Sequence, residues 1–113
     1  MSGSRASRER WSAFSLEEQI ANIGSEVGRA INARINEDLP LMEGAINRAL
    51  DLFLATFEIA LREKKNMHRI REIIRARDEF MSLFYIDTFD IKEAQKIEAY
   101  FMNFAYIVRS RSK

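Results

Sequence analysis

The sequence contains no cysteine, which excludes disulfide bonds, thiolate metal sites and cysteine nucleophiles. It has one proline and four glycines, and so few helix breakers favour long helices over a β-sandwich with many tight turns. It also lacks the uninterrupted apolar run of about 20 residues that a membrane span needs. Residues 1–10 are polar and basic, so we expect neither a signal peptide nor a membrane anchor, and a cytoplasmic location.

The sequence also lacks a strong excess of charge. Its formal net charge is +1 at pH 7, which provides little long-range attraction to phosphate polymers. The 113 residues are within the usual size of one domain, and a hydrophobic content of 47% is sufficient for a packed core. We therefore expect a single domain at residues 15–109, between a flexible basic tail at 1–14 and a second basic tail at 110–113.

Capping residues and apolar periodicity predict the first two helices. Ser15 and Glu18 have the spacing of a capping box, and apolar residues then recur at steps of three and four to about residue 36. Asp38 is placed to cap the second helix, and Pro40 falls in its first turn, where the missing N–H costs little. The second helix is apolar around most of its circumference, which is typical of a helix covered by neighbours or by a partner chain.

Two further helices follow. The third is predicted over residues 67–85 with Asn66 as a candidate N-cap, and the fourth begins after Asp90, which has Glu93 at the third position. Helices of roughly 20 residues, each about 30 Å long, must fold back on one another when short loops join them. The sequence therefore predicts an all-α fold, an antiparallel up-down-up-down four-helix bundle.

One pair of residues has a spacing known from nucleases. Arg62 and His68, the only histidine, stand six residues apart, and this spacing resembles the ribonuclease motif of HEPN domains. The resemblance implies that these two residues, paired across a dimer of helical bundles, cleave RNA through the ribose 2′-hydroxyl. Glu63 follows Arg62 where that family usually has Asn, Asp or His. The alternative is an ordinary surface histidine.

Basic residues recur along the start of the third predicted helix. Lys64, His68, Arg71 and Arg75 are separated by steps of four, three and four, and Arg69 lies beside them. Such a ridge could neutralise nucleic-acid phosphates and release their counterions. The competing interpretation, which we favour, is a solvated face whose basic and acidic residues form weak ion pairs.

No other site for chemistry is recognisable. The sequence has a single histidine and no Glu-x-x-His pair, so we expect no metal site, and it has neither a phosphate-binding glycine loop nor a nucleophile elbow. We expect no cofactor and no small-molecule substrate, and we favour a protein that is not an enzyme.

Two features suggest helix contacts beyond a minimal core. Gly24 and Gly28 lie inside the first helix, where each costs about 1 kcal/mol relative to alanine, so we expect them to let another helix approach closely. The fourth helix carries more aromatic residues than one inward stripe needs, among them Tyr100 and Tyr106. Soluble monomers seldom expose large apolar patches, so this excess indicates self-association.

Several segments resemble a family of short, uncharacterised prokaryotic helical proteins. These are the runs 16–30 (LEEQIANIGSEVGRA), 48–52, 71–75 and 100–106. The resemblance implies the helical fold and no particular activity. The general plan is also similar to the four-helix bundles of ribosomal intervening-sequence proteins and of accessory variability proteins, which oligomerise and bind nucleic acid.

Three functions remain open from the sequence. The favoured one is a helical bundle that acts through protein contacts and self-associates. The first alternative is an RNA- or DNA-binding accessory bundle that uses the basic ridge, and the second is the HEPN-like ribonuclease.

Overall fold

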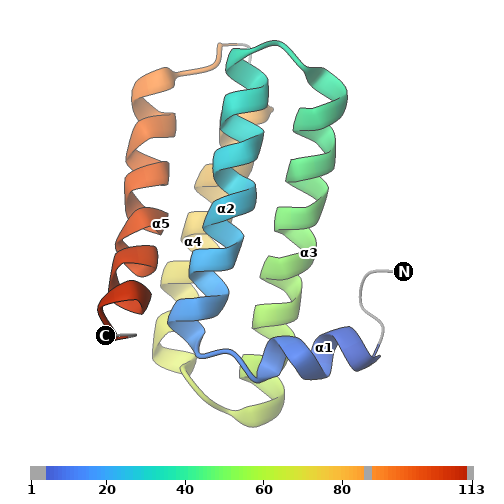
Figure 1. The fold of residues 1–113 in the computed structure, drawn as a ribbon, viewed down its shortest axis with the longest axis vertical. Coiled ribbons are helices and arrows are strands. Elements are labelled where there is room, and N and C mark those ends of the chain that lie inside the picture. The colour runs from blue at the N-terminus through green and yellow to red at the C-terminus, as the bar shows by residue number, and fades with distance from the viewer. Residues whose placement is uncertain (1–4, 86–87, 112–113) are drawn as a thin grey trace.

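The computed structural model describes residues 5–85 and 88–111. These residues are all-helical and contain no strand, as the sequence predicts. Figure 1 shows the five helices, which are α1 (Arg5–Ser12), α2 (Leu16–Ile35), α3 (Leu39–Glu63), α4 (Met67–Phe84) and α5 (Ile91–Arg111). Within the described residues, no helix is long and apolar enough to cross a membrane.

The N-terminal segment differs from the prediction of a flexible tail at residues 1–14. Residues 5–12 form α1, which lies across the lower end of the molecule in Figure 1. Its anchor is Trp11, whose indole N–H donates to the hydroxyl of Thr56 on α3 over 3.1 Å. The side chain of Gln19 on α2 donates to the backbone oxygens of Trp11 and Phe14 over 3.2 and 3.1 Å. These contacts join α1 to two of the long helices.

The C-terminal boundary also differs. We expected a basic tail at 110–113, but α5 continues through Arg111. The guanidinium of Arg111 donates to the carboxylate of Glu17 on α2 over 3.1 Å, and this contact ties the end of α5 to the start of α2. Residues 112–113 lie outside the described residues.

Three of the four predicted N-caps are present. Ser15 accepts from the backbone N–H of Glu18 over 3.1 Å, and the Glu18 carboxylate accepts in return from the backbone of Ser15 over 2.8 Å. Asp38 accepts from the backbone of Leu41 over 3.2 Å. Asp90 accepts from the backbone N–H groups two and three residues later. These local bonds explain why α2, α3 and α5 begin where the sequence predicts.

Asn66 does not cap α4 with its side chain, although the sequence predicts this cap. Asn66 does precede α4, but its φ is 59° and its side chain makes no capping hydrogen bond. A capping side chain reaches the first turn from extended backbone, which the left-handed conformation does not provide. Lys64 is also left-handed, and its N–H donates to Ala60 to end α3. The tight 64–66 connection therefore takes the place of a side-chain cap.

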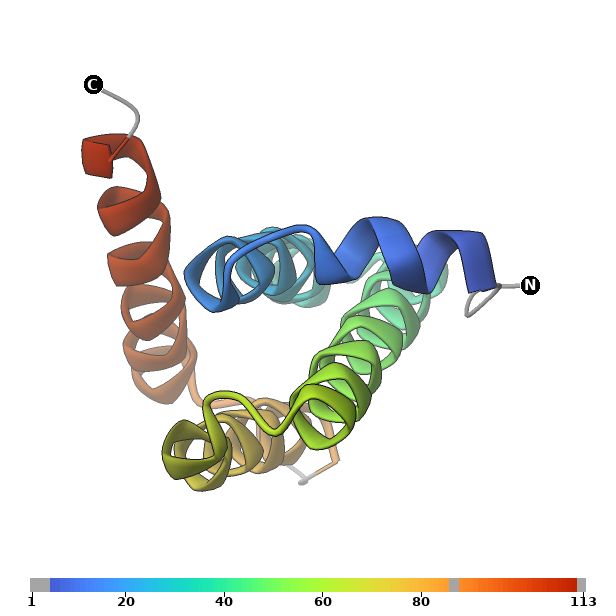
Figure 2. The same ribbon diagram turned by 90° about the horizontal axis from the view of Figure 1, so that it is seen from below.

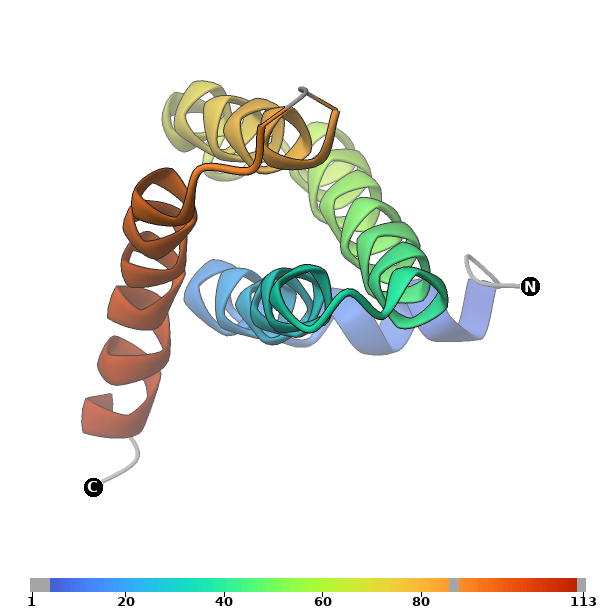
Figure 3. The ribbon, with the colours of Figure 1, turned by 90° about the horizontal axis from the view of Figure 1, so that it is seen from above.

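The core is built around α2, which lies between α3 and α5 when the molecule is seen from either end (Figures 2 and 3). Its stripe of Ile20, Ile23, Val27 and Ile31 is almost completely buried. The fourth long helix, α4, packs against α3 and α5 through large side chains. Phe53 on α3 lies with its ring 6.4 Å from that of Phe80 on α4.

One carboxylate is buried within this arrangement. Glu26 on α2 is 5% exposed, and it accepts from Arg29 on the same helix and from Arg48 on α3. Burial acts to raise the pKa of Glu26, but the hydrogen bonds and charges of the two arginines outweigh it, so the pKa lies below the usual value. The cluster links α2 to α3 at the edge of the core.

Candidate interaction surfaces

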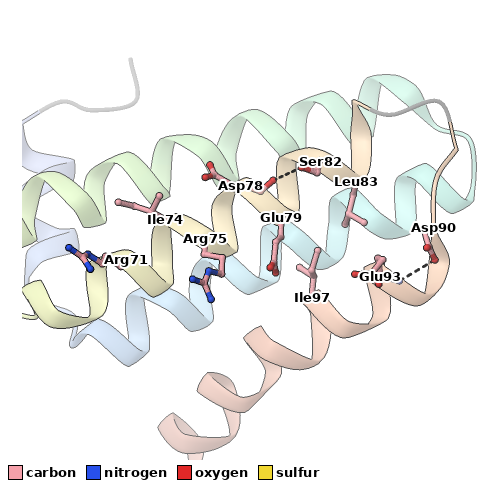
Figure 4. Close-up of a pocket in the computed structure, with 10 residues that line it drawn as sticks. All are labelled: Arg71, Ile74, Arg75, Asp78, Glu79, Ser82, Leu83, Asp90, Glu93 and Ile97. Carbon is pink, nitrogen blue, oxygen red and sulfur yellow. Dashed lines mark hydrogen bonds between the residues drawn. The ribbon is translucent and has the colours of Figure 1, made fainter.

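Four of the five predicted members of the basic ridge are exposed, and three of these four lie on α4. Lys64, His68, Arg71 and Arg75 are exposed, and among the described residues none of the four has an ion-pair partner. Figure 4 shows Arg71 and Arg75 one turn apart on α4. Lys64 ends α3 and does not stand on α4, so the predicted helical spacing holds for His68, Arg71 and Arg75.

Arg69, the fifth member of the predicted ridge, has a different position. Its side chain is 26% exposed and donates to Glu17 on α2 over 2.8 Å. Its guanidinium also lies 5.5 Å from the centre of the Phe104 ring on α5. Burial acts to raise the pKa of Glu17, but hydrogen bonds from its own backbone and from Arg69 and Arg111 lower it below the usual value. Arg69 thus connects three helices and is not placed to contact an external polymer.

The two residues of the HEPN-like spacing lie on different helices. Arg62 is exposed at the end of α3, with its guanidinium 4.0 Å from the carboxylate of Glu63. His68 is exposed in the first turn of α4. Within the described residues no hydrogen bond joins them.

Glu72 stands four residues after His68, but its carboxylate is hydrogen-bonded to a side chain of α5. Its carboxylate accepts from the hydroxyl of Tyr100 over 2.8 Å. Burial of Tyr100 and this bond to a carboxylate both raise the pKa of the phenol above its usual value. In the part of the chain that the structure describes, no group of three or more potential ligands is arranged to hold a metal ion.

An open pocket of about 440 Å³ lies along α4 and the start of α5 (Figure 4). Arg71 and Arg75 line one end, and carboxylates such as Glu79 and Glu93 line the other. Ile74, Leu83 and Ile97 supply apolar surface. The pocket carries both signs of charge and contains no nucleophile paired with a base, so it offers no constellation for catalysis.

The two glycines of α2 have different surroundings. A Cβ built on Gly24 would lie 2.7 Å from the Cβ of Phe101 on α5, so the absence of a side chain permits this close approach. A Cβ on Gly28 would meet only the Glu98 carboxylate, at 3.9 Å, which is an ordinary contact. The close helix contact that we expected at both positions is present at Gly24 and lies within the chain.

Exposed apolar side chains gather on the outer side of α3 and α4. Leu54 and Leu61 on α3 are 49% and 60% exposed, and Met67 and Ile74 on α4 are 46% and 36% exposed. The half-buried ring of Phe57 lies between the helices, with the Arg77 guanidinium 5.4 Å from its centre. We call this surface the α3–α4 face, defined by Leu54, Phe57, Leu61, Met67, Ile70, Ile74 and Met81. Large apolar side chains are exposed elsewhere too, around the α2–α3 connection (Ile35, Leu39 and Leu41), on α5 (Ile91, Met102, Tyr106 and Ile107) and at Phe14 and Tyr85.

The sequence carried a usable signal for two of the residues whose positions it did not predict. Arg69 is on the core stripe of α4, four residues before the buried Ile73, so a semi-buried position follows from periodicity. Trp11 is followed by Phe14 in an otherwise polar segment, and their rings make an edge contact with centroids 5.6 Å apart. The partner of Trp11 was not predictable, because Thr56 is 45 residues away.

No family model matches the chain, and neither a curated protein nor a solved structure shows significant similarity. The resemblance to the uncharacterised helical family stays a prediction. Function must be inferred from the surfaces described above.

Proposed function

We propose that this protein is a self-associating helical bundle that acts through protein contacts in the cytoplasm and is not an enzyme. In this proposal α2 to α5 form an up-down-up-down bundle of four long helices, and α1 closes one end. The observation that supports it best is the α3–α4 face, where four large apolar side chains are at least about one third exposed on adjacent helices. Contiguous apolar surface of this kind is uncommon on monomers and is typical of interaction sites.

The test is the mass of the full chain in solution over a wide concentration range, measured by light scattering and by sedimentation. Self-association predicts a mass that rises above that of one 13.2 kDa chain as concentration increases. A mass that stays at one chain up to the highest concentration reached would refute the proposal.

A nucleic-acid function is the second candidate, because Lys64, His68, Arg71 and Arg75 are exposed and without ion-pair partners among the described residues. Each phosphate contact should release counterions, so binding should weaken steeply with salt. In an electrophoretic shift with single-stranded RNA and duplex DNA, Arg75→Glu should reduce binding, while the reversal Lys92→Glu on α5 should change it little. Equal binding by both variants, or no shift at low salt, would refute this candidate.

A further inference from the structure

We propose that a second copy of this chain packs on the α3–α4 face in an antiparallel arrangement, with the two-fold axis close to Leu61 and Ile74. This inference rests on the proposed self-association and specifies its surface and geometry. Three observations support it: the alignment of apolar residues on the face, the level at which the two helices contact each other, and the order of charges along both margins.

The apolar residues lie in two rows, one on α3 and one on α4. On α3, Leu54, Phe57 and Leu61 are separated by three and four residues, so they lie on the same side of the helix. On α4, Met67, Ile74 and Met81 are seven residues apart and share a side in the same way. The contact between Arg77 and Phe57 joins the two rows across the helix pair.

The same contact sets the relative height of the two helices. The Phe53 ring lies 6.4 Å from the Phe80 ring and Phe57 contacts Arg77, so in the antiparallel pair of α3 and α4 in Figure 1 Ile74 lies near residue 60 of α3. Leu61, near the end of α3, therefore lies beside Ile74, near the middle of α4. A two-fold axis through this point, perpendicular to the helices, places both residues against their own copies.

The charges on α4 are compatible with this two-fold symmetry. Arg71 and Asp78 stand three residues before and four residues after Ile74 and are both exposed. Asp78 contacts Arg77 over 3.2 Å, yet its side chain is 62% exposed, so it is open to a further partner. In an antiparallel pair of α4 helices centred on Ile74, Arg71 of one copy lies opposite Asp78 of the second copy. The two-fold symmetry repeats this contact, so the dimer contains two such pairs.

The margin of α3 has the same order of charges around the same centre. Glu58 and Arg62 are exposed and lie two residues before and two residues after residue 60, although Glu58 already takes part in an interaction and Arg62 lies 4.0 Å from Glu63. The axis that brings Arg71 to Asp78 therefore also brings Glu58 of one copy to Arg62 of the second copy. Opposite charges face each other at these four positions.

The size of the face predicts a weak dimer. The 18 residues of α4 span about 27 Å, and two adjacent helices are about 20 Å wide, so the footprint is on the order of 500 Å². Stable interfaces bury about 800 Å² per partner, and smaller ones belong to transient complexes. We expect the dimer to dissociate on dilution.

The first test places a charge at the centre of the face. In sedimentation equilibrium of the full chain, Leu61→Asp and Ile74→Asp should each weaken dimerisation at least about tenfold, because each puts two carboxylates at the axis. Met102→Asp is the matched control, since Met102 on α5 is 62% exposed, close to the 60% of Leu61, and lies on another surface. It should leave the dimer unchanged. Circular dichroism would show that each variant keeps its helices.

The second test exchanges charges and leaves the apolar surface intact. Arg71→Glu alone and Asp78→Arg alone should each weaken the dimer about three- to tenfold at low salt, since two pairs are lost. The double variant Arg71→Glu/Asp78→Arg should restore dimerisation to within about twofold of the unmodified chain.

The outcomes separate this inference from the proposed function. A chain that stays monomeric refutes the self-association itself. A chain that dimerises although Leu61→Asp and Ile74→Asp have no effect, or a double charge variant that is weaker than either single variant, refutes the α3–α4 face and leaves self-association in place.

Discussion

The two glycines of α2 provide a sharp test of the packing, because the same substitution should act in opposite directions at two positions one turn apart. Gly24→Ala would place a Cβ 2.7 Å from the Cβ of Phe101. That atom is fixed to the α5 backbone, and Phe101 is buried, so relief requires α2 and α5 to separate. Gly28→Ala would place its Cβ 3.9 Å from the end of the flexible Glu98 side chain, where nothing has to move.

The magnitudes follow from two contributions. Replacing glycine by alanine inside a helix stabilises by about 1 kcal/mol at either position. Forcing a methyl group into a well-packed contact costs about 1–3 kcal/mol, and this cost applies at Gly24 alone. The helix-propensity gain cancels when the two variants are compared. We therefore expect Gly28→Ala to be more stable than Gly24→Ala by about 1–3 kcal/mol, and more stable than the unmodified chain.

The assay is urea unfolding followed by circular dichroism, with all three chains at one low concentration, because self-association would add concentration-dependent stability. Equal m-values would show that the comparison concerns stability alone. If the two variants differ by less than about 0.3 kcal/mol, or if Gly24→Ala is the more stable one, the close packing of α2 on α5 is wrong.

Three further predictions concern single residues. The pKa values of Glu17 and Glu26 are lowered in the folded chain, so both carboxylates should contribute to the free energy of unfolding above the unfolded pKa of about 4.3. This contribution should be lost as the pH falls through the lower folded values. In unfolding measured against pH, Glu26→Gln should therefore lose less stability at acid pH than the unmodified chain. Trp11→Phe removes the N–H bound to Thr56, so hydrogen exchange in residues 5–12 should accelerate while exchange in α2 is unchanged. His68→Ala should leave the fold intact because His68 is exposed, and only a loss of RNA cleavage in that variant would support the ribonuclease hypothesis.

The parts of the fold that could be predicted from the sequence are those that depend on neighbouring residues. The helix starts at Ser15, Asp38 and Asp90 were predictable because each cap binds backbone within three residues. The helix at residues 5–12 was not, since its anchor on Thr56 is distant in the sequence. Asn66 has the residue type of a cap, but the turn geometry at 64–66 decides its conformation.

The candidate surfaces were likewise predictable only where they depend on residues close in the sequence. The helical spacing of Arg71 and Arg75 was sufficient to predict one exposed ridge, because both point away from the core stripe of α4. Arg69 was assigned to that ridge, whereas its contacts with Glu17 and Phe104 come from two other helices. Periodicity shows which side of a helix a residue occupies, but the identity of a distant partner depends on how the helices pack.

Sedimentation equilibrium of the unmodified chain beside Ile74→Asp and Met102→Asp is the decisive test of dimerisation through the α3–α4 face. We predict that the unmodified chain and Met102→Asp form a dimer that dissociates on dilution, and that Ile74→Asp has the mass of one chain at the same concentrations. A monomer in all three samples would contradict the proposed self-association, and a dimer in all three would contradict the α3–α4 face.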